Sequence, residues 1–233
     1  MYVVIAGGGI AGRRVAKFLM ERKHDVVVID IDKSVCEDLY VEYGIVCVHG
    51  SASDIGTLKE AGIEKAHVAI AAMYRDIDNL SFALLASSFN VPRIIVKMRD
   101  PEYEEAYKKA GATVIASMTD LFLTRVIMEI ESPLIKRVTV LPGSQGELVM
   151  AKVYEGCMLE GMRIGELEDM KEFPKDVIVV GVFSEKKRKL MTSRRDHVLE
   201  AGDDVFFIAT PENFGKLNQI FAVCRINKKG GGR

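Results

Sequence analysis

Short apolar runs alternate with helical patterns over the first 135 residues, and this alternation restricts the possible folds more than any other feature of the chain. The runs are almost free of polar residues, which is typical of strands buried on both faces of a parallel sheet. Between them, Asp100-Pro101 marks a helix start and Gly111 a helix end. The alternation predicts an α/β fold with a doubly wound parallel sheet. The expected strands are Val3–Ala6, Val26–Ile29, Ile45–Val48, Val68–Ala72, Ile94–Met98 and Thr113–Ala116.

A different pattern begins near residue 140, where short strands are separated by turns rich in glycine and charge. Only 163–170 and 212–221 have helical patterns there, and the expected strands are 149–154, 177–183, 189–192 and 204–209. We therefore expect a first domain over residues 1–135, a small α+β domain over 140–222 and a flexible tail over 223–233.

An apolar helix is expected between the two domains, near 119–131, before Ser132-Pro133 interrupts it. Its hydrophobic side chains need a cover. The residues alone leave two alternatives open: the helix folds back on its own domain, or it crosses to a partner subunit.

The composition excludes several classes of protein. The chain carries 32 Lys and Arg against 33 Asp and Glu, a net charge of −1, whereas a general nucleic-acid binder needs a basic surface. The longest uncharged stretch, 79–92, has 14 residues, fewer than the roughly 20 that span a bilayer. We therefore expect no nucleic-acid partner and no transmembrane segment.

The four cysteines are Cys36, Cys47, Cys157 and Cys224, and they form no C-x-x-C pair and no zinc-ligand spacing. A strand pattern starts at Met1 without a basic segment or a cleavage site, so we expect no secretion signal. We expect four reduced, mostly buried thiols in an intracellular protein, and no metal site.

A glycine-rich motif follows the first expected strand directly. Residues 7–12 fit G-x-G-x-x-G, in which the first glycine permits a tight turn, the second admits a pyrophosphate and the third allows close packing. The following helix N-terminus offers free N–H groups to phosphates. Asp30 ends the second strand 18 residues after Gly12, where a carboxylate can accept hydrogen bonds from a ribose. This context predicts nucleotide binding, and the carboxylate disfavours NADP because it would repel a 2′-phosphate.

Ligands of such sheets lie beyond the carboxyl ends of the strands, where the strand order reverses. That rule adds candidates from the loops after the third, fourth and fifth strands. Arg13 and Arg14, in the first helical turn, either contact a phosphate or are solvated. The candidate binding residues are Gly7, Gly8, Gly9, Ile10, Ala11, Gly12, Asp30, Ile31, Asp32, Lys33, Gly50, Ser51, Ala52, Ala71, Ala72, Met73, Asn79 and Lys97.

An NAD-dependent oxidoreductase is the rival interpretation. Hydride transfer also needs a group that handles the substrate proton. Among the histidines, only His49 is expected near the crevice, and no carboxylate partner for it is evident. No catalytic motif occurs. The pattern favours a nucleotide sensor without catalytic residues.

The first domain resembles the RCK (or KTN) nucleotide-binding domain of potassium channels and of Trk/Ktr potassium-uptake regulators. Four segments carry the resemblance: 4–9, 27–32, 58–63 and 98–103. The second domain resembles the small C-terminal RCK domain through 160–167 and 197–203. The likeness covers residues 1–222 and is greatest to TrkA-type proteins with a single RCK unit.

The resemblance implies a cytoplasmic gating subunit without enzymatic activity, peripheral at the inner face of the membrane. Its partner would be a membrane-embedded potassium channel or transporter. Dimers would form through the helix near 119–131 and would assemble into octameric rings. The ligand would be an adenine nucleotide (AMP, ADP or ATP) or NAD(H) in a Rossmann crevice. A nucleotide-binding regulator of another partner remains an alternative.

Three positions depart from the family pattern. Many relatives have an arginine in the glycine loop where this chain has Ile10, Gly-Asp where it has Gly50-Ser51, and an arginine where it has Lys97. These differences leave AMP, ADP or NAD at least as well supported as ATP.

Overall fold

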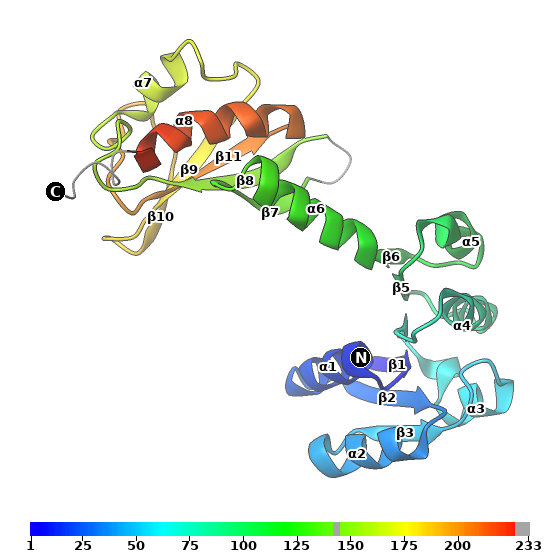
Figure 1. The fold of residues 1–233 in the computed structure, drawn as a ribbon. Coiled ribbons are helices and arrows are strands. Elements are labelled where there is room, and N and C mark those ends of the chain that lie inside the picture. The colour runs from blue at the N-terminus through cyan, green and yellow to red at the C-terminus, as the bar shows by residue number, and fades with distance from the viewer. Residues whose placement is uncertain (142–144, 227–233) are drawn as a thin grey trace. The chain divides into compact units, whose positions relative to one another are not determined.

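A computed structural model describes residues 1–141 and 145–226, with side chains up to residue 222 (Figure 1). Contacts divide the chain into two compact units, Met1–Phe122 and Leu123–Arg233. The predicted domains, 1–135 and 140–222, meet between residues 135 and 140, whereas these units divide within α6, between Phe122 and Leu123. Most of the predicted tail, 227–233, lies outside the described residues, and α8 continues to Ile226.

The first unit contains a parallel six-stranded sheet of order β3-β2-β1-β4-β5-β6. The strand order reverses beside β1, which pairs with β2 on one side and β4 on the other. This order confirms the predicted doubly wound sheet. The strands are β1 (Tyr2–Ala6), β2 (Asp25–Asp30), β3 (Val46–His49), β4 (Val68–Ala71), β5 (Ile94–Met98) and β6 (Val114–Ser117).

Helices cover both faces of this sheet, which explains why its strands are uniformly apolar. One core joins Ala16 of α1 (Ile10–Glu21) and Leu39 of α2 (Lys33–Tyr43) to Val3 and Ile5. The other core contains side chains of α3, α4 and α5. These helices are α3 (Ile55–Glu60), α4 (Asp76–Ser88) and α5 (Glu104–Lys109), with 3₁₀ turns η1 (Ile63–Lys65) and η2 (Pro101–Tyr103).

The apolar helix α6 (Met118–Glu131) buries none of its side chains among the described residues. Leu121, Phe122 and Ile130 are 63%, 67% and 74% exposed. Met128, further along the helix, is partly buried against the core of the second unit.

The second unit is built on an antiparallel sheet of order β10-β9-β11-β8-β7. Its core includes Val149, Val205 and Phe207 from the strands and Phe221 from α8. The sequence pattern missed β7, an edge strand whose central residues are mostly charged or polar. The elements are β7 (Ile135–Val140), β8 (Glu147–Lys152), α7 (Ile164–Asp169), β9 (Ile178–Ser184), β10 (Lys189–Thr192), β11 (Asp204–Ala209), η3 (Pro211–Asn213) and α8 (Phe214–Ile226).

The cysteines differ from the expectation of four reduced thiols. Cys36 of α2 and Cys47 of β3 form a disulfide, with their Cα atoms 5.1 Å apart. Their spacing in the chain does not indicate the pairing, because the two residues meet only when α2 packs against the sheet beside β3. Cys157 is buried and free, and the side chain of Cys224 lies outside the described residues. None of the helices in the described ranges has the length and apolar character needed to cross a bilayer.

Candidate nucleotide-binding site

The glycine loop joins β1 to α1, and a glycine occupies each of its three motif positions for a different structural reason. Gly7 has φ +97°, a left-handed conformation that favours glycine. A Cβ on Gly12 would lie 1.8 Å from the Gly7 carbonyl oxygen, so any side chain there would collide with backbone. A Cβ on Gly9 would meet nothing within 4 Å. Gly9 therefore borders open space, and the uncapped first turn of α1 presents N–H donors to an anion there.

Asp30, the last residue of β2, fixes this loop. Its Oδ2 accepts a hydrogen bond from Gly8 N at 2.6 Å, and its Oδ1 accepts one from Asp32 N at 2.9 Å. The carboxylate is thus held between the glycine loop and the start of α2. Each oxygen keeps a further lone pair that can accept from a ribose hydroxyl.

The neighbouring charged candidates are engaged elsewhere. Asp32 is the N-cap of α2 and accepts from the hydroxyl and N–H of Ser34, and these hydrogen bonds lower the pKa of its carboxyl. Lys33 forms an ion pair with Glu37 at 3.5 Å. Neither Asp32 nor Lys33 lines the crevice.

A crevice of about 990 Å³ lies at the carboxyl ends of the strands, at the upper end of the size range of small-molecule sites. It brings together most of the predicted positions: Gly7, Gly9, Ile10, Ala11, Asp30, Ile31, Gly50, Ser51, Ala52, Ala72, Met73 and Lys97. The remaining candidates are not among its lining residues: Gly8, Gly12, Asp32, Lys33, Ala71 and Asn79.

Asn79 was expected to contact a ligand, but it is fully buried and joins two strands. Its Oδ1 accepts from Met73 N at 2.9 Å, and its Nδ2 donates to the carbonyl of Lys97 at 3.0 Å and to that of Met73 at 3.3 Å. The amide therefore positions the loop after β4 against the end of β5, behind two residues that do line the crevice.

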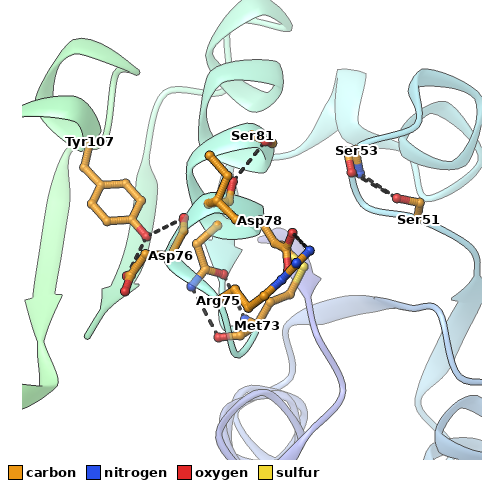
Figure 2. A network of polar contacts seen from close by, with 10 residues as sticks. Ser51, Ser53, Met73, Arg75, Asp76, Asp78, Ser81 and Tyr107 are labelled. Atoms are coloured by element: carbon orange, nitrogen blue, oxygen red, sulfur yellow. Dashed lines mark hydrogen bonds and ion pairs between the residues drawn. The ribbon is translucent and has the colours of Figure 1, made fainter. Parts of the chain in front are cut away.

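Cations gather on the side of the crevice formed by β4, β5 and α4. We call Tyr74, Arg75, Lys97 and Arg99 the cationic wall. Arg75 pairs with Asp78 through bonds of 2.8 and 2.6 Å (Figure 2), whereas the Arg99 guanidinium lies 4.2 Å from the centre of the Tyr74 ring. Lys97 donates from Nζ to the Ala72 carbonyl at 3.2 Å, and burial lowers the pKa of its ammonium.

Buried Asp76, at the start of α4, supports this wall from behind. Its carboxylate accepts from Arg99 N at 3.0 Å and from Asp100 N at 3.1 Å. The hydroxyl of Tyr107 donates to Asp76 Oδ1 at 2.9 Å (Figure 2), and burial raises the pKa of that phenol. Asp76 thus fixes the backbone that carries Arg99.

The two arginines of the first α1 turn have different surroundings. Arg13 lies 3.8 Å from Asp38 and 3.9 Å from Glu42. Arg14 lines the crevice, and its side chain makes no hydrogen bond or ion pair with the described parts of the chain. Arg14 is therefore the arginine of this pair that can reach a bound phosphate.

Sequence reasoning missed part of the lining because these residues belong to no motif. Arg75 and Arg99 lie in the loops after β4 and β5, at the sheet edge where ligands bind. Their location directly after these strands could have identified them as candidates. The residues outside the candidate set are Arg14, Ile29, Ser53, Tyr74, Arg75, Asp78, Arg99 and Met118.

No histidine is among the residues that line the crevice. His49 lies at the end of β3, with Nε2 3.1 Å from the Ile31 carbonyl oxygen. His24 and His67 lie at the other end of the sheet, beside Met1 and Tyr2. The crevice can therefore hold a nucleotide through amides, the Asp30 carboxylate and cations, without a histidine in its lining that could transfer a proton.

A doubly wound sheet with a glycine loop and an acid after β2 defines a nucleotide-binding domain of the Rossmann class, here followed by a small antiparallel domain. Family models identify it further: a TrkA-N domain matches residues 3–118 and a TrkA-C domain matches residues 148–222. The chain belongs to the TrkA family.

Several curated relatives carry the name Trk system potassium uptake protein TrkA or its homologue. One from Methanothermobacter thermautotrophicus is 30% identical over 205 residues, which are 88% of this chain and 92% of that protein. One from Halomonas elongata is 29% identical, and the match covers 90% of this chain but 46% of that protein.

Solved structures share the fold. The GsuK channel aligns with a TM-score of 0.66 at 22% identity, covering 94% of this chain and 39% of the channel chain. The GsuK channel bound to NAD aligns with a TM-score of 0.62. The chain thus spans less than half of these channel chains. The likeness is to RCK domains and confirms the predicted fold class.

Proposed function

We propose that this protein is a nucleotide-sensing regulatory subunit of a potassium uptake channel or transporter, and that it has no catalytic activity of its own. The observation that carries the proposal is the crevice, where the glycine loop and a hydrogen-bonded Asp30 face a cationic wall. Family membership supplies the potassium system, because the curated relatives are named as potassium uptake proteins. A ligand regulates such a system only as far as it prefers one of two states.

The proposed ligand is AMP, ADP, ATP or NAD(H). Asp30 would accept the ribose hydroxyls, and its fixed negative charge disfavours NADP. The phosphates would lie over Gly9, within reach of Arg14 and the cationic wall. The GsuK channel bound to NAD has the same fold, which supports a dinucleotide as one candidate.

The experiment that tests ligand binding compares two aspartates that are two residues apart. Asp30→Asn removes a carboxylate from the crevice, whereas Asp32→Asn changes a carboxylate outside it and keeps a good N-cap residue. We expect the first variant to weaken ADP or NAD binding at least tenfold by calorimetry, and the second to leave it within twofold. Equal affinities in the two variants would exclude Asp30 as the ribose ligand. Mass spectrometry of ligand released from the purified protein would identify the native nucleotide.

The proposed assembly is a homodimer through α6, with dimers forming an octameric ring. The exposed apolar side chains of α6 support it, since such a face needs a cover. Phe122→Asp is expected to convert dimers to monomers in light scattering. Val41→Asp, at a position that is 81% exposed on α2, serves as the control. Dimers that persist in Phe122→Asp would place the interface elsewhere.

We place the protein in the cytoplasm, held at the inner face of the membrane by its potassium-conducting partner. The test is reconstituted potassium flux with that partner in vesicles. Flux that is insensitive to every nucleotide that the protein binds would leave the alternative, a regulator of another partner.

An NAD-dependent oxidoreductase has one observation in its favour, a crevice lysine whose pKa is lowered. A group of this kind can transfer a substrate proton. NADH formation with a panel of alcohols and hydroxy acids, abolished by Lys97→Met, would establish that activity. We expect no turnover.

A further inference from the structure

The Cys36–Cys47 disulfide has no part in the function described so far, and it lies directly behind the glycine-loop side of the crevice. It connects α2 to β3 across 11 residues of sequence. Cys36 is 8% exposed, whereas Cys47 is half-buried on an edge strand of the sheet. Cys47 is therefore the more accessible cysteine of the pair.

Helix α2 forms part of the support of the glycine loop. A Cβ on Gly8 would lie 2.7 Å from Val35 Cγ1 and 2.9 Å from Leu39 Cδ1, so both side chains pack against the loop. Cys36 lies between these two residues in sequence. Its sulfur is 4.0 Å from the carbonyl oxygen of Asp30. A change in the position of α2 therefore reaches both the loop and the carboxylate.

Strand β3 supplies the other side of the connection. Cys47 is in register with Val28 of β2, and the strand ends at His49, just before Gly50–Ser53 enter the crevice. Gly50 N donates to the Asp30 carbonyl at 2.9 Å. The disulfide thus links the helix that follows Asp30 in the chain to the strand that pairs beside it.

We propose that Cys36–Cys47 is a reversible redox-modification site that sets the nucleotide affinity of the crevice. The inference rests on the proposed nucleotide-sensing function. The oxidised form holds α2 against β3 and keeps Asp30 and the glycine loop in their binding geometry. In the reduced form, α2 is held against the sheet by packing alone. Nucleotide binding must then also order α2, the glycine loop and Asp30, and this lowers the affinity.

The reaction is thiol–disulfide exchange with a glutathione-type thiol. A thiolate attacks Cys47 Sγ and forms a mixed disulfide, while Cys36 leaves as a thiolate and takes up a proton. A second thiol then displaces Cys47 from the mixed disulfide. Two small thiols are oxidised to one small disulfide, and the protein disulfide is reduced to two thiols. In the proposed cytoplasmic location, disulfides are rare and those that occur are commonly redox-sensing.

The experiment uses the full chain with Cys157→Ser and Cys224→Ser, so that only the pair can react. ADP and NAD affinities are measured by calorimetry after oxidation with diamide and after reduction, with thiol counts by mass spectrometry. We expect reduction to weaken binding by about fivefold or more, the lower range of measured site-to-site couplings. Cys47→Ser, at the half-exposed position, should bind as the reduced form does under both conditions.

Linkage provides a second readout that a purely structural disulfide would not move. Saturating ADP should shift the dithiol-to-disulfide ratio in a glutathione buffer toward the disulfide, by the same factor as the change in affinity. Equal affinities in both redox states, with only a higher unfolding temperature when oxidised, would overturn the inference and leave the nucleotide sensor intact. Absence of ADP and NAD binding in both states would overturn the proposed function and this inference together.

Discussion

The two sides of the crevice are built in different ways. On the glycine-loop side, Gly7, Gly9 and Asp30 shape the surface through backbone conformation and hydrogen bonds to backbone amides. On the other side, the cationic wall consists of side chains, and buried Asp76 and Asn79 hold the loops that carry them. Backbone geometry fixes where a phosphate can lie, whereas side-chain charge decides how strongly it is held.

This difference determines how each side responds to mutation. On the glycine-loop side, a side chain at Gly7 or Gly12 alters the fold of the loop itself, because a Cβ there would meet backbone atoms. A change at the tip of the cationic wall removes one charge and leaves the fold unchanged. The predictions below test that contrast, from the largest expected effect to the smallest.

The largest effect is expected for Gly12→Ala. The new Cβ would lie 1.8 Å from the Gly7 carbonyl oxygen, a backbone atom that cannot rotate away. We expect the free energy of unfolding of the first unit to fall by about 3 kcal/mol or more, measured by urea denaturation. Gly9→Ala is the matched control, because its Cβ meets nothing within 4 Å. It should fold normally and weaken only nucleotide binding, and a stable Gly12→Ala protein would contradict the assigned packing role.

The second prediction concerns the support of the cationic wall. Asp76→Ala leaves the backbone N–H groups of Arg99 and Asp100 without their acceptor. The Tyr107 hydroxyl loses its bond to the carboxylate and keeps the one to the backbone carbonyl of residue 76. We expect a loss of about 2–3 kcal/mol in the free energy of unfolding, since each buried unsatisfied group is costly.

The neighbouring Asp78→Ala is the control, because the Asp78 carboxylate pairs with the solvent-exposed guanidinium of Arg75 and not with buried groups of the wall. It should change the free energy of unfolding by less than about 1 kcal/mol. Equal losses in the two variants would show that Asp76 is not the support of this wall.

The third prediction separates two arginines at the tip of the wall. Arg99 stacks on Tyr74, and no carboxylate of the described residues forms an ion pair with it, whereas Arg75 is paired with Asp78. Arg99→Ala should weaken ADP binding about tenfold, the value of one charge-assisted hydrogen bond. Arg75→Ala should weaken it about twofold or less, since Asp78 already neutralises that charge. Calorimetry measures the ADP affinity of both variants, and unchanged unfolding curves show that both remain folded. An equal or larger loss in Arg75→Ala would contradict the prediction.

The same contrast explains what the sequence could predict. The alternation of apolar runs and helical patterns predicted the doubly wound sheet, and G-x-G-x-x-G with Asp30 predicted the glycine-loop side, because backbone constraints leave fixed residue types at fixed spacings. Arg75 and Arg99 follow no such spacing, since a cation can reach a phosphate from several loop positions. The role of Asn79 in joining strands, and the pairing of Cys36 with Cys47, depend on contacts between separate segments of the chain. Such contacts are visible only in the folded structure.

The smallest effect is expected from the titration of Lys97. Burial lowers the pKa of its ammonium below the ordinary 10.5. A bound phosphate favours the charged form, so the affinity contributed by this lysine is complete below the lowered pKa of the free protein and is lost as the pH rises through it. ADP affinity should therefore be constant near neutral pH and fall by about threefold as the pH rises through this alkaline range, a value typical of a partly exposed charge pair. Lys97→Arg keeps its charge throughout this interval and should remove the pH dependence while retaining binding. A pH dependence that persists in Lys97→Arg would assign the titration to a different group, and Lys97 would then contribute the same charge to the cationic wall at every pH tested.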